Sequence, residues 1–447
     1  MATLSRRELL AALGALPLLP RLGRGASRPI PTVSQLLWQR DELALFIHFG
    51  VNTFTDREWG DGRESPSIFA PDALDARQWA RTARAAGARA RVLTPKHHDG
   101  FCLWPTATTR HSVASSPWRG GQGDLVREFT DACRAEGLRA GLYLSPWDQN
   151  APVYSDSPRY DRFYCDQLTE LLTRYGPIHE VWFDGANGEG PNGKRQVYDW
   201  PRYWGLVRQL QPEAVMFSDA GPDVRWIGNE RGVAGETNWS TVDPTIVPRP
   251  GMTGDEVMRS LTEGDRDGTV WRPGETDTSI RPGWFWHPDQ DDKVRSVDDL
   301  VELHFTSVGR NSKLLLNVPP TRHGLLHDTD VARLTAMRAR LDAQFGRPVP
   351  VREAPITTEG PAGATFERPT TIGVVELREE IESGQRVARH RVEVLRGTTW
   401  HEVGRGTTIG YKRLYRIDPV RASAVRVHVD DAVLSPRPIA VASYPPA

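Results

Sequence analysis

Glu180-Val181-Trp182-Phe183-Asp184-Gly185 is the stretch that most clearly indicates the fold, because a short apolar run ends in a carboxylate and a glycine. Comparable short runs recur along the chain, and polar side chains follow them. Their length and their polar boundaries are typical of buried strands. The expected strands cover residues 44–47, 90–93, 141–144, 180–183, 214–217 and 313–318.

Amphipathic stretches lie between these runs, at residues 75–86, 124–136, 158–175, 201–210 and 297–308. In the second stretch Leu125, Phe129 and Ala132 recur at helical spacing, and Gly137 supplies a stop signal. Alternating strands and helices predict parallel βα units. The sequence has no GxGxxG turn of the kind that marks many open sheets. We therefore expect an α/β protein with a (β/α)8 TIM-like barrel over residues 31–345.

The pattern changes after Arg347-Pro348-Val349-Pro350, where helical stretches end. Short alternating runs follow at residues 372–377, 387–395 and 425–429, separated by glycine-containing turns. In the last run the valines alternate with Arg426 and His428, which is typical of a half-buried antiparallel strand. We expect a linker at residues 346–355 and a C-terminal antiparallel β-sandwich at residues 356–447.

The N-terminus has the composition of an export signal. Arg6 and Arg7 precede a short apolar run that ends near Leu19, the pattern of a twin-arginine signal. The run is too short to cross a bilayer, and no other segment reaches about 18 unbroken apolar residues. Residues 1–30 are therefore expected to be a signal peptide, and the protein is expected to be exported without a membrane span.

Composition excludes several functional classes. Of the 447 residues, 38% are hydrophobic, so the chain has enough apolar surface for folded domains. The 56 Lys and Arg residues balance the 57 Asp and Glu residues, which argues against a nucleic-acid partner. Three cysteines without CxxC spacing are too few for a disulfide framework or a structural zinc site.

Polar residues of reactive type follow at least six of the expected strands. In parallel barrels the carboxyl ends of the strands meet on one face, where active sites form. These strand-end groups should therefore lie close together. They include His48, Lys96-His97-His98-Asp99, Ser145, Asp184, Ser218-Asp219 and Asn317.

Asp184 is the leading candidate for a chemical role. A carboxylate after an apolar strand can act as a nucleophile, a general base or a metal ligand, but it can equally cap the next helix. Glu58, Glu230 and Glu236 are candidates for a second carboxyl. A pair of carboxyls around one scissile bond is the machinery of glycoside hydrolysis.

Histidine and tryptophan usage favours sugar binding over metal binding. Adjacent His97 and His98 on an extended chain point to opposite sides, so one ion is awkward to bind with both. Imidazoles can instead form hydrogen bonds with sugar hydroxyls. Five tryptophans in polar, loop-like surroundings could stack on sugar rings, although ordinary packing also explains them. They are Trp59, Trp104, Trp147, Trp284 and Trp286.

Together these segments resemble glycoside hydrolase family 29, the α-L-fucosidases, over about residues 36–440. Five motifs at strand ends carry the resemblance, and the glycine-containing segments at residues 384–387 and 406–414 resemble that family's galactose-binding-like sandwich. Residues 218–223, leading to Gly228-Asn229-Glu230, are similar to the subgroup that acts on α-1,3/1,4-linked fucose. The five motifs are Phe46–Gly50, Glu58-Trp59, Lys96–Phe101, Tyr143–Ser145 and Val181–Gly185.

The resemblance implies a retaining exo-α-L-fucosidase that uses double displacement on fucosylated oligosaccharides or glycoconjugates, without a cofactor or metal. Asp184 matches the nucleophile, and Glu230 matches the acid/base, with Glu236 as the alternative. The resemblance also assigns the substrate-binding side chains, with Trp286 facing the C5 methyl of the sugar. These are His48, Glu58, Trp59, His97, His98, Tyr143 and Trp286.

Two other classes remain open on the residues alone. A carbohydrate-binding protein on the same barrel would keep the histidines and tryptophans but not the catalytic pair. A metal-dependent hydrolase would use His48, His97, His98 and Asp184 as ligands. The linkage, the aglycone and the oligomeric state are not determined by the sequence.

Overall fold

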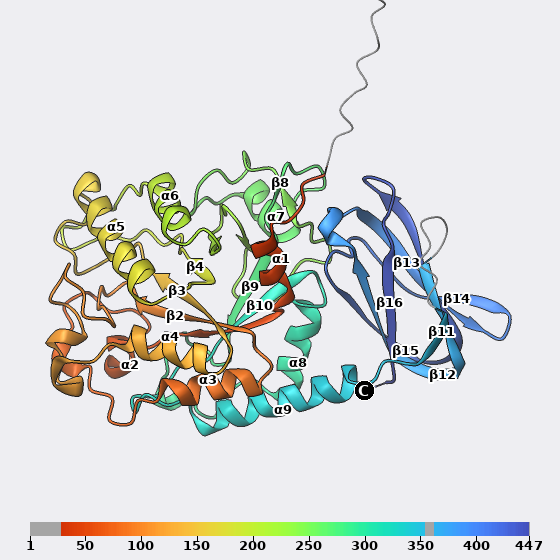
Figure 1. The fold of residues 1–447 in the computed structure, drawn as a ribbon, viewed down its shortest axis with the longest axis horizontal. Helices are drawn as coiled ribbons and strands as arrows, with labels where there is room; N and C mark the ends of the chain where they lie inside the picture. The colour runs from red at the N-terminus through yellow and green to blue at the C-terminus, as the bar shows by residue number, and fades with distance from the viewer. Residues whose placement is uncertain (1–27, 354–361, 447) are drawn as a thin grey trace, which may run out of the picture.

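The computed structural model describes residues 28–353 and 362–446, so most of the expected signal peptide lies outside the described residues. Two bodies are visible in Figure 1, a barrel surrounded by helices and a β domain drawn in blue. Among the described residues, none of the helices combines the length and apolar character that a bilayer crossing requires.

Eight parallel strands form the barrel, in the order β5-β4-β3-β2-β1-β10-β9-β6. The ring is nearly closed, because Phe217 at the end of β5 forms a parallel bridge with Val224, just before β6. The strands are β1 (Leu43–Ile47), β2 (Ala90–Lys96), β3 (Arg139–Leu144), β4 (Glu180–Trp182), β5 (Val215–Phe217), β6 (Arg225–Trp226), β9 (Gly274–Ser279) and β10 (Ser312–Asn317).

The expected (β/α)8 barrel is confirmed, and all six expected strands are present. The sequence analysis missed β6 and β9. β6 has only two residues, and β9 reads Gly-Glu-Thr-Asp-Thr-Ser, without an apolar side chain, although every residue in it is buried. A hydrophobic pattern cannot reveal a strand whose buried side chains are polar.

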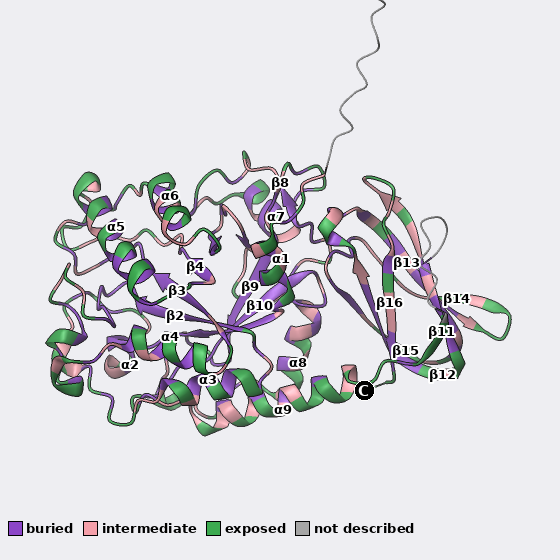
Figure 2. Ribbon diagram, viewed as in Figure 1, coloured by how far each residue is buried: buried purple, intermediate pink, exposed green. Residues whose placement is uncertain are grey.

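Helices cover the outside of the barrel, with their buried faces toward the strands (Figure 2). In α4, the side chain of Asp124 caps the first turn through the Arg127 amide, and Leu125, Phe129 and Cys133 are buried. The helices are α1 (Val33–Arg40), α2 (Val51–Thr55), α3 (Ala76–Ala85), α4 (Leu125–Ala135), α5 (Ser157–Arg174), α6 (Trp200–Leu210), α7 (Asp255–Glu263), α8 (Val297–Thr306) and α9 (Asp328–Phe345).

The C-terminal domain is a six-stranded antiparallel sheet with its own apolar core. Its two longest strands carry register shifts, which allow a strand to bend around a core. β11 falls inside the expected linker and pairs with β12. The strands are β11 (Val351–Glu353), β12 (Ala362–Glu379), β13 (Val387–Arg396), β14 (Thr399–Gly406), β15 (Arg413–Ala432) and β16 (Ile439–Tyr444). A separate pair, β7 (Thr241–Val242) and β8 (Val270–Trp271), lies in the connection between β6 and β9.

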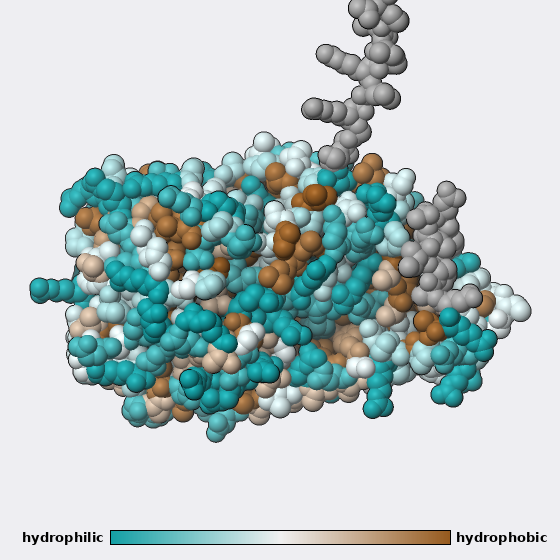
Figure 3. Space-filling model, in the orientation of Figure 1, coloured by the Kyte–Doolittle hydropathy of each residue, from teal (hydrophilic) through white to brown (hydrophobic). Residues whose placement is uncertain are grey.

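Polar side chains join the two bodies. The side-chain oxygen of Asn311, which follows α8, accepts the Tyr411 amide at 2.7 Å, and the backbone amide of Asn238 donates to the Thr408 hydroxyl oxygen of the sandwich at 2.8 Å. The surface on the face shown in Figure 3 is mostly hydrophilic, with apolar residues in small separate groups. The sandwich is held to the barrel by these hydrogen bonds and by an apolar cluster of Phe305, Val374, Leu414 and Tyr444 that spans the boundary.

A buried lysine side chain forms ion pairs inside the barrel. Lys313 Nζ of β10 lies 2.6 Å from Glu180 Oε2 of β4 and 3.2 Å from Glu275 Oε2 of β9. All three side chains are almost completely inaccessible to solvent. Burial, together with the charge of Glu180, raises the pKa of Glu275 well above its usual range. One positive and one negative charge therefore offset each other inside the barrel.

Lys313→Met should lower the free energy of unfolding by about 3–5 kcal/mol, because it leaves the Glu180 charge buried without a partner. The double variant Lys313→Met/Glu180→Gln removes both charges and should be more stable than the single variant. Urea unfolding of both variants measures the difference. A double variant no more stable than Lys313→Met would contradict the ion pair.

Candidate functional site

The carboxyl ends of the barrel strands surround a hollow of about 200 Å³. It contains seven of the nine side chains predicted from the sequence, which confirms that strand-end residues gather on one face. A hollow of this size is smaller than the ~300–1,000 Å³ of sites for drug-sized ligands. The lining residues are Phe46, His48, Trp59, His97, His98, Tyr143, Trp182, Asp184, Ala186, Glu230, Asp277 and Trp284.

Asp184 follows β4 and is held at both carboxylate oxygens. The Tyr143 hydroxyl donates to Oδ2 at 2.7 Å, and the Ala186 amide donates to Oδ1 at 2.7 Å. Burial and the nearby Asp184 charge raise the pKa of Tyr143 well above its usual range, so the phenol remains a donor. The side chain of Asp184 is still 27% exposed, which leaves it accessible from the hollow.

His48 follows β1, and its neighbours determine its tautomer. The side-chain amide of Asn317 donates to the Trp284 carbonyl at 2.8 Å, which leaves Asn317 Oδ1 as an acceptor. This oxygen lies 2.8 Å from His48 Nδ1, so Nδ1 carries the proton. Burial lowers the pKa of His48 to about 3. His48 is therefore neutral, and its Nε2 is an acceptor.

His98 has the same tautomer for a similar reason. Ser145 donates its single hydroxyl proton to the Trp147 carbonyl at 2.7 Å, so it must accept from His98 Nδ1, also at 2.7 Å. Nε2 then carries a lone pair, 3.8 Å from Asp184 Oδ2. Burial lowers the pKa of His98 more than the Asp184 charge raises it. His97 packs beside it, with ring centroids 4.0 Å apart.

Glu230 lines the hollow. It lies four residues after Trp226, the last residue of β6. Partial burial raises its pKa, and the charges of Asp184 and Glu58 raise it further. Glu236 lies elsewhere: Arg310 and Arg413 pair with its carboxylate at the boundary between the two bodies, and they lower its pKa. Only one of the two glutamates can thus reach the hollow in its acid form.

Glu58 lies beside the hollow without lining it. Its carboxylate accepts the Trp284 amide at 2.9 Å and contacts His287 Nε2 at 2.7 Å. These contacts attach the segment after β1 to the segment after β9. Glu58 therefore supports one wall of the hollow through the backbone of Trp284.

The aromatic wall expected from Trp286 comes instead from Trp284. The Trp286 indole donates to Asp291 at 3.0 Å, and its ring lies 5.8 Å from the Arg322 guanidinium carbon, outside the hollow. Two residues earlier, Trp284 lies 5.2 Å from His48 between ring centroids. The segment carries three consecutive aromatic residues, and sequence spacing cannot tell which of them points inward.

Asp277 of β9 is a lining residue that the sequence analysis missed. Its side chain is buried, and it accepts the Trp226 indole proton at 2.8 Å. Burial, helped by the charges of Glu230 and Asp184, raises the pKa of Asp277 to about 8. The only local signal was an acidic residue alternating with threonines, which is indistinguishable from an exposed turn.

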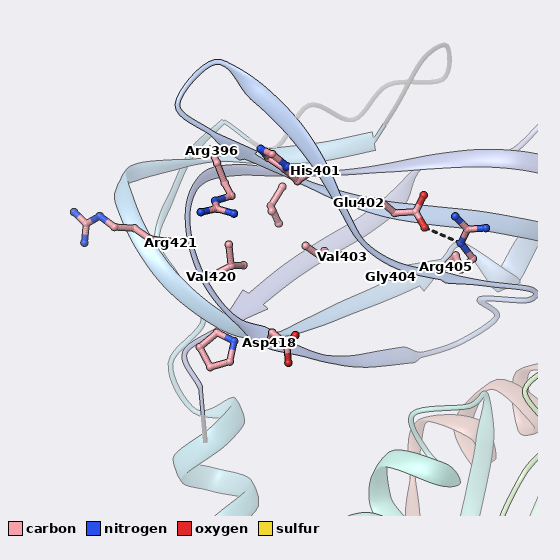
Figure 4. Close-up of a pocket in the computed structure, with 11 residues that line it drawn as sticks. Arg396, His401, Glu402, Val403, Gly404, Arg405, Asp418, Val420 and Arg421 are labelled. Carbon is pink, nitrogen blue, oxygen red and sulfur yellow. Dashed lines mark hydrogen bonds and ion pairs between the residues drawn. The ribbon is translucent and has the colours of Figure 1, made fainter.

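Nothing in the described residues groups three or more His, Cys, Asp or Glu side chains in a metal-binding arrangement. A second hollow, of about 640 Å³, lies on the C-terminal domain between β13, β14 and β15 (Figure 4). There Glu402 pairs with Arg405 at 2.7 Å, and Arg421 points away from the hollow. Its acidic side chains are exposed, so it lacks a desolvated carboxyl pair.

Comparisons with known proteins agree with this geometry. The family model described as alpha-L-fucosidase matches residues 58–344. Alpha-L-fucosidase 1 of Arabidopsis thaliana is 42% identical over 443 residues, which cover 91% of this chain and 86% of the relative. The family-model match includes the barrel strands from β2 to β10 and begins after β1.

Two solved structures share the fold along nearly the whole chain. A glycoside hydrolase 29 family member from an unknown rumen bacterium is 40% identical, with a TM-score of 0.88, covering 94% of this chain and 78% of the other. A fucosidase of the same family from Ruminococcus gnavus, solved in complex with fucose, is 31% identical, with a TM-score of 0.82. The match covers 94% of this chain and 95% of the other. The chain therefore belongs to the α-L-fucosidase family of enzymes, glycoside hydrolase family 29.

Proposed function

We propose that this protein is a retaining exo-α-L-fucosidase that hydrolyses terminal α-1,3/1,4-linked fucose from oligosaccharides or glycoconjugates. The observation that carries the proposal is the presence of two carboxyls, Asp184 and Glu230, in one small hollow with different surroundings. In glycosidases, two such carboxyls divide the work between a nucleophile and a proton donor.

Asp184 would act as the nucleophile. Its carboxylate attacks the anomeric carbon, and the bond to the departing oxygen breaks as the covalent fucosyl-enzyme bond forms. Hydrogen bonds from Tyr143 and from the Ala186 amide hold both oxygens in place. Preorganisation of this kind supplies part of the rate, because no donor has to move during attack.

Glu230 would act as the acid and then as the base. Its raised pKa keeps a proton available for the departing oxygen in the first step. The resulting carboxylate then removes a proton from water, whose oxygen displaces Asp184 from the anomeric carbon. The proton on Glu230 is restored, and the product keeps the anomeric configuration of the substrate.

His48 and His98 would hold the sugar hydroxyls. Each presents an unprotonated Nε2, so each accepts a hydrogen bond from a hydroxyl. Their ring orientations are set by Asn317, at the end of β10, and by Ser145, which follows β3. The small volume of the hollow fits one sugar ring, which supports removal of terminal residues only.

Asp184→Ala should reduce turnover of every fucoside by roughly 10⁴-fold or more, because no covalent intermediate can form. Azide can occupy the space of the missing carboxylate and attack from the same side. The expected product is a fucosyl azide of inverted configuration, identified by NMR. An active variant without azide would overturn the role of Asp184.

Glu230→Ala should slow hydrolysis of natural glycans by about 10²–10⁴-fold, since their leaving groups need a proton. An aryl fucoside with a good leaving group should lose far less in the fucosylation step. Initial rates on both substrates measure the difference. Asp131→Asn is the matched control, because this acid is exposed on α4 outside the hollow, and it should leave both rates near wild type.

The pH profile gives a second measure of the same role. Activity on natural glycans should fall as the pH rises through the pKa of Glu230, because only the acid form donates. At saturating substrate, where changes in affinity do not contribute, this limb should be absent from the residual activity of Glu230→Ala. Equal losses of that variant on both substrates, with the alkaline limb retained, would remove Glu230 from the acid role.

The linkage preference can be tested directly. The segment from Ser218 to Glu230 connects β5 to the proton donor, and it carries the similarity to the α-1,3/1,4 subgroup. Released L-fucose should be measured from matched oligosaccharides with 1,2, 1,3, 1,4 and 1,6 linkages. We expect release from the 1,3 and 1,4 linkages, and preferential release from the 1,2 or 1,6 linkage would refute the subgroup. A strong chelator should not change these rates, whereas it would inactivate a metal-dependent hydrolase.

A further inference from the structure

The sugar hollow contains a third carboxyl that the mechanism above does not use. Asp277 projects from β9 and is 3% exposed, while Asp184 and Glu230 approach from β4 and from the segment after β6. Neither Lys nor Arg is among the residues that line this hollow. Three ionised carboxylates in about 200 Å³ without a cation would repel one another strongly, so at least one must be neutral.

Burial and two nearby charges favour the neutral form of Asp277, and they outweigh the hydrogen bond from the Trp226 indole, which favours the ionised form. Glu230 and Asp184 face it across the hollow, and His48 and His98 there are uncharged. On the same strand, Glu275 lies two residues earlier, and its carboxyl contacts the buried Lys313 side chain. On the neighbouring strand β10, the residue in register with Asp277 is the apolar Leu315. Burial raises the pKa of Asp277 to about 8, in agreement with this arrangement.

The Trp226 indole determines which oxygen of Asp277 can carry the proton. Because Nε1 donates to Oδ1 at 2.8 Å, Oδ1 acts as the acceptor, and the acid proton belongs on Oδ2. Among the polar groups whose protonation the neighbouring contacts determine, His48 Nε2, His98 Nε2 and the Asp184 carboxylate are acceptors, whereas the acid proton of Glu230 is reserved for the departing oxygen. A bound sugar also has oxygens that must receive hydrogen bonds, and a neutral acid supplies a donor for one of them.

We propose that Asp277 is a further sugar-binding residue, which accepts the indole proton of Trp226 at one oxygen and donates its own acid proton to a substrate oxygen from the other. This inference rests on the proposed function, because it takes fucose as the occupant of the hollow. It assigns Asp277 to recognition of the sugar and leaves the covalent chemistry with Asp184 and Glu230.

Binding of free L-fucose to the full-length protein tests the assignment without turnover. Isothermal titration calorimetry at pH 6.5 gives the Kd for wild type, Asp277→Leu, Asp277→Asn and the matched control Asp131→Asn. Asp131 is an exposed acid on α4, on the outside of the barrel, and its variant should bind like wild type. Asp277→Leu should weaken binding by about tenfold or more. Asp277→Asn keeps an acceptor for Trp226 and an N–H donor, so it should recover most of that loss.

The pH dependence distinguishes a hydrogen-bond donor from a structural side chain. A carboxyl group is neutral below its pKa. The Asp277 donor is therefore present at pH 6.5 and lost as the pH rises through about 8. Wild-type Kd for L-fucose, which does not ionise in this range, should therefore increase about tenfold between pH 7 and 9. Asp277→Asn cannot ionise and should show a clearly smaller increase.

Several results would overturn the inference. These are wild-type affinity in Asp277→Leu, a loss in Asp277→Asn as large as in Asp277→Leu, or the same pH dependence in Asp277→Asn and wild type. If Asp277→Leu does not fold, as judged by circular dichroism, the comparison of Asp277→Asn with wild type decides alone. Absence of L-fucose binding by wild type would overturn the proposed function as well, whereas the other outcomes leave that function standing.

Discussion

The buried ion pair between Lys313 and Glu180 is the interaction on which the barrel depends. It allows β9, a strand made only of polar residues and glycine, to take its place between β10 and β6. Without a cation at this point, Glu180 and Glu275 would face each other in a medium of low dielectric constant. The same cluster supports the floor of the sugar hollow, because the Trp182 indole donates to Glu275 at 3.0 Å. Trp182 in turn stacks on Phe217, with ring centroids 4.2 Å apart.

Above this floor, the site holds few charges. Burial keeps His48 and His98 neutral, and their partners turn a lone pair of each toward the hollow. A neutral imidazole accepts a hydrogen bond from a sugar hydroxyl without attracting the nucleophile into an ion pair. In the proposed mechanism the Asp184 carboxylate is then free to attack the anomeric carbon, and partial burial raises the pKa of Glu230, with the charges of Asp184 and Glu58 raising it further.

The C-terminal domain contacts the loop that carries Glu230 and Glu236. Arg413 of β15 and Arg310 bind the carboxylate of Glu236, six residues beyond Glu230. This anchors the far end of the loop that carries the proposed proton donor. Arg413 from this domain and Arg310 from the barrel therefore explain why Glu236 is unavailable as an acid.

Much of the fold could be predicted, because most strands of a parallel barrel are continuous apolar runs. That pattern identified β1 to β5 and β10, and the residues after them pointed to one rim. It failed at β6 and β9, where burial is satisfied by ion pairs and hydrogen bonds. For the same reason Asp277 was missed, although it lies in the hollow with Asp184.

The sequence by itself determined the barrel class, the second domain and the chemical types at the rim, because these follow from local periodicity and strand ends. Only the tertiary structure decided which glutamate reaches the hollow, which tryptophan forms its wall and which carboxyls are neutral. Those properties depend on burial and on partners far apart in the chain. Glu230 and Glu236 have similar local sequences, but one faces a buried carboxylate and the other faces two arginines.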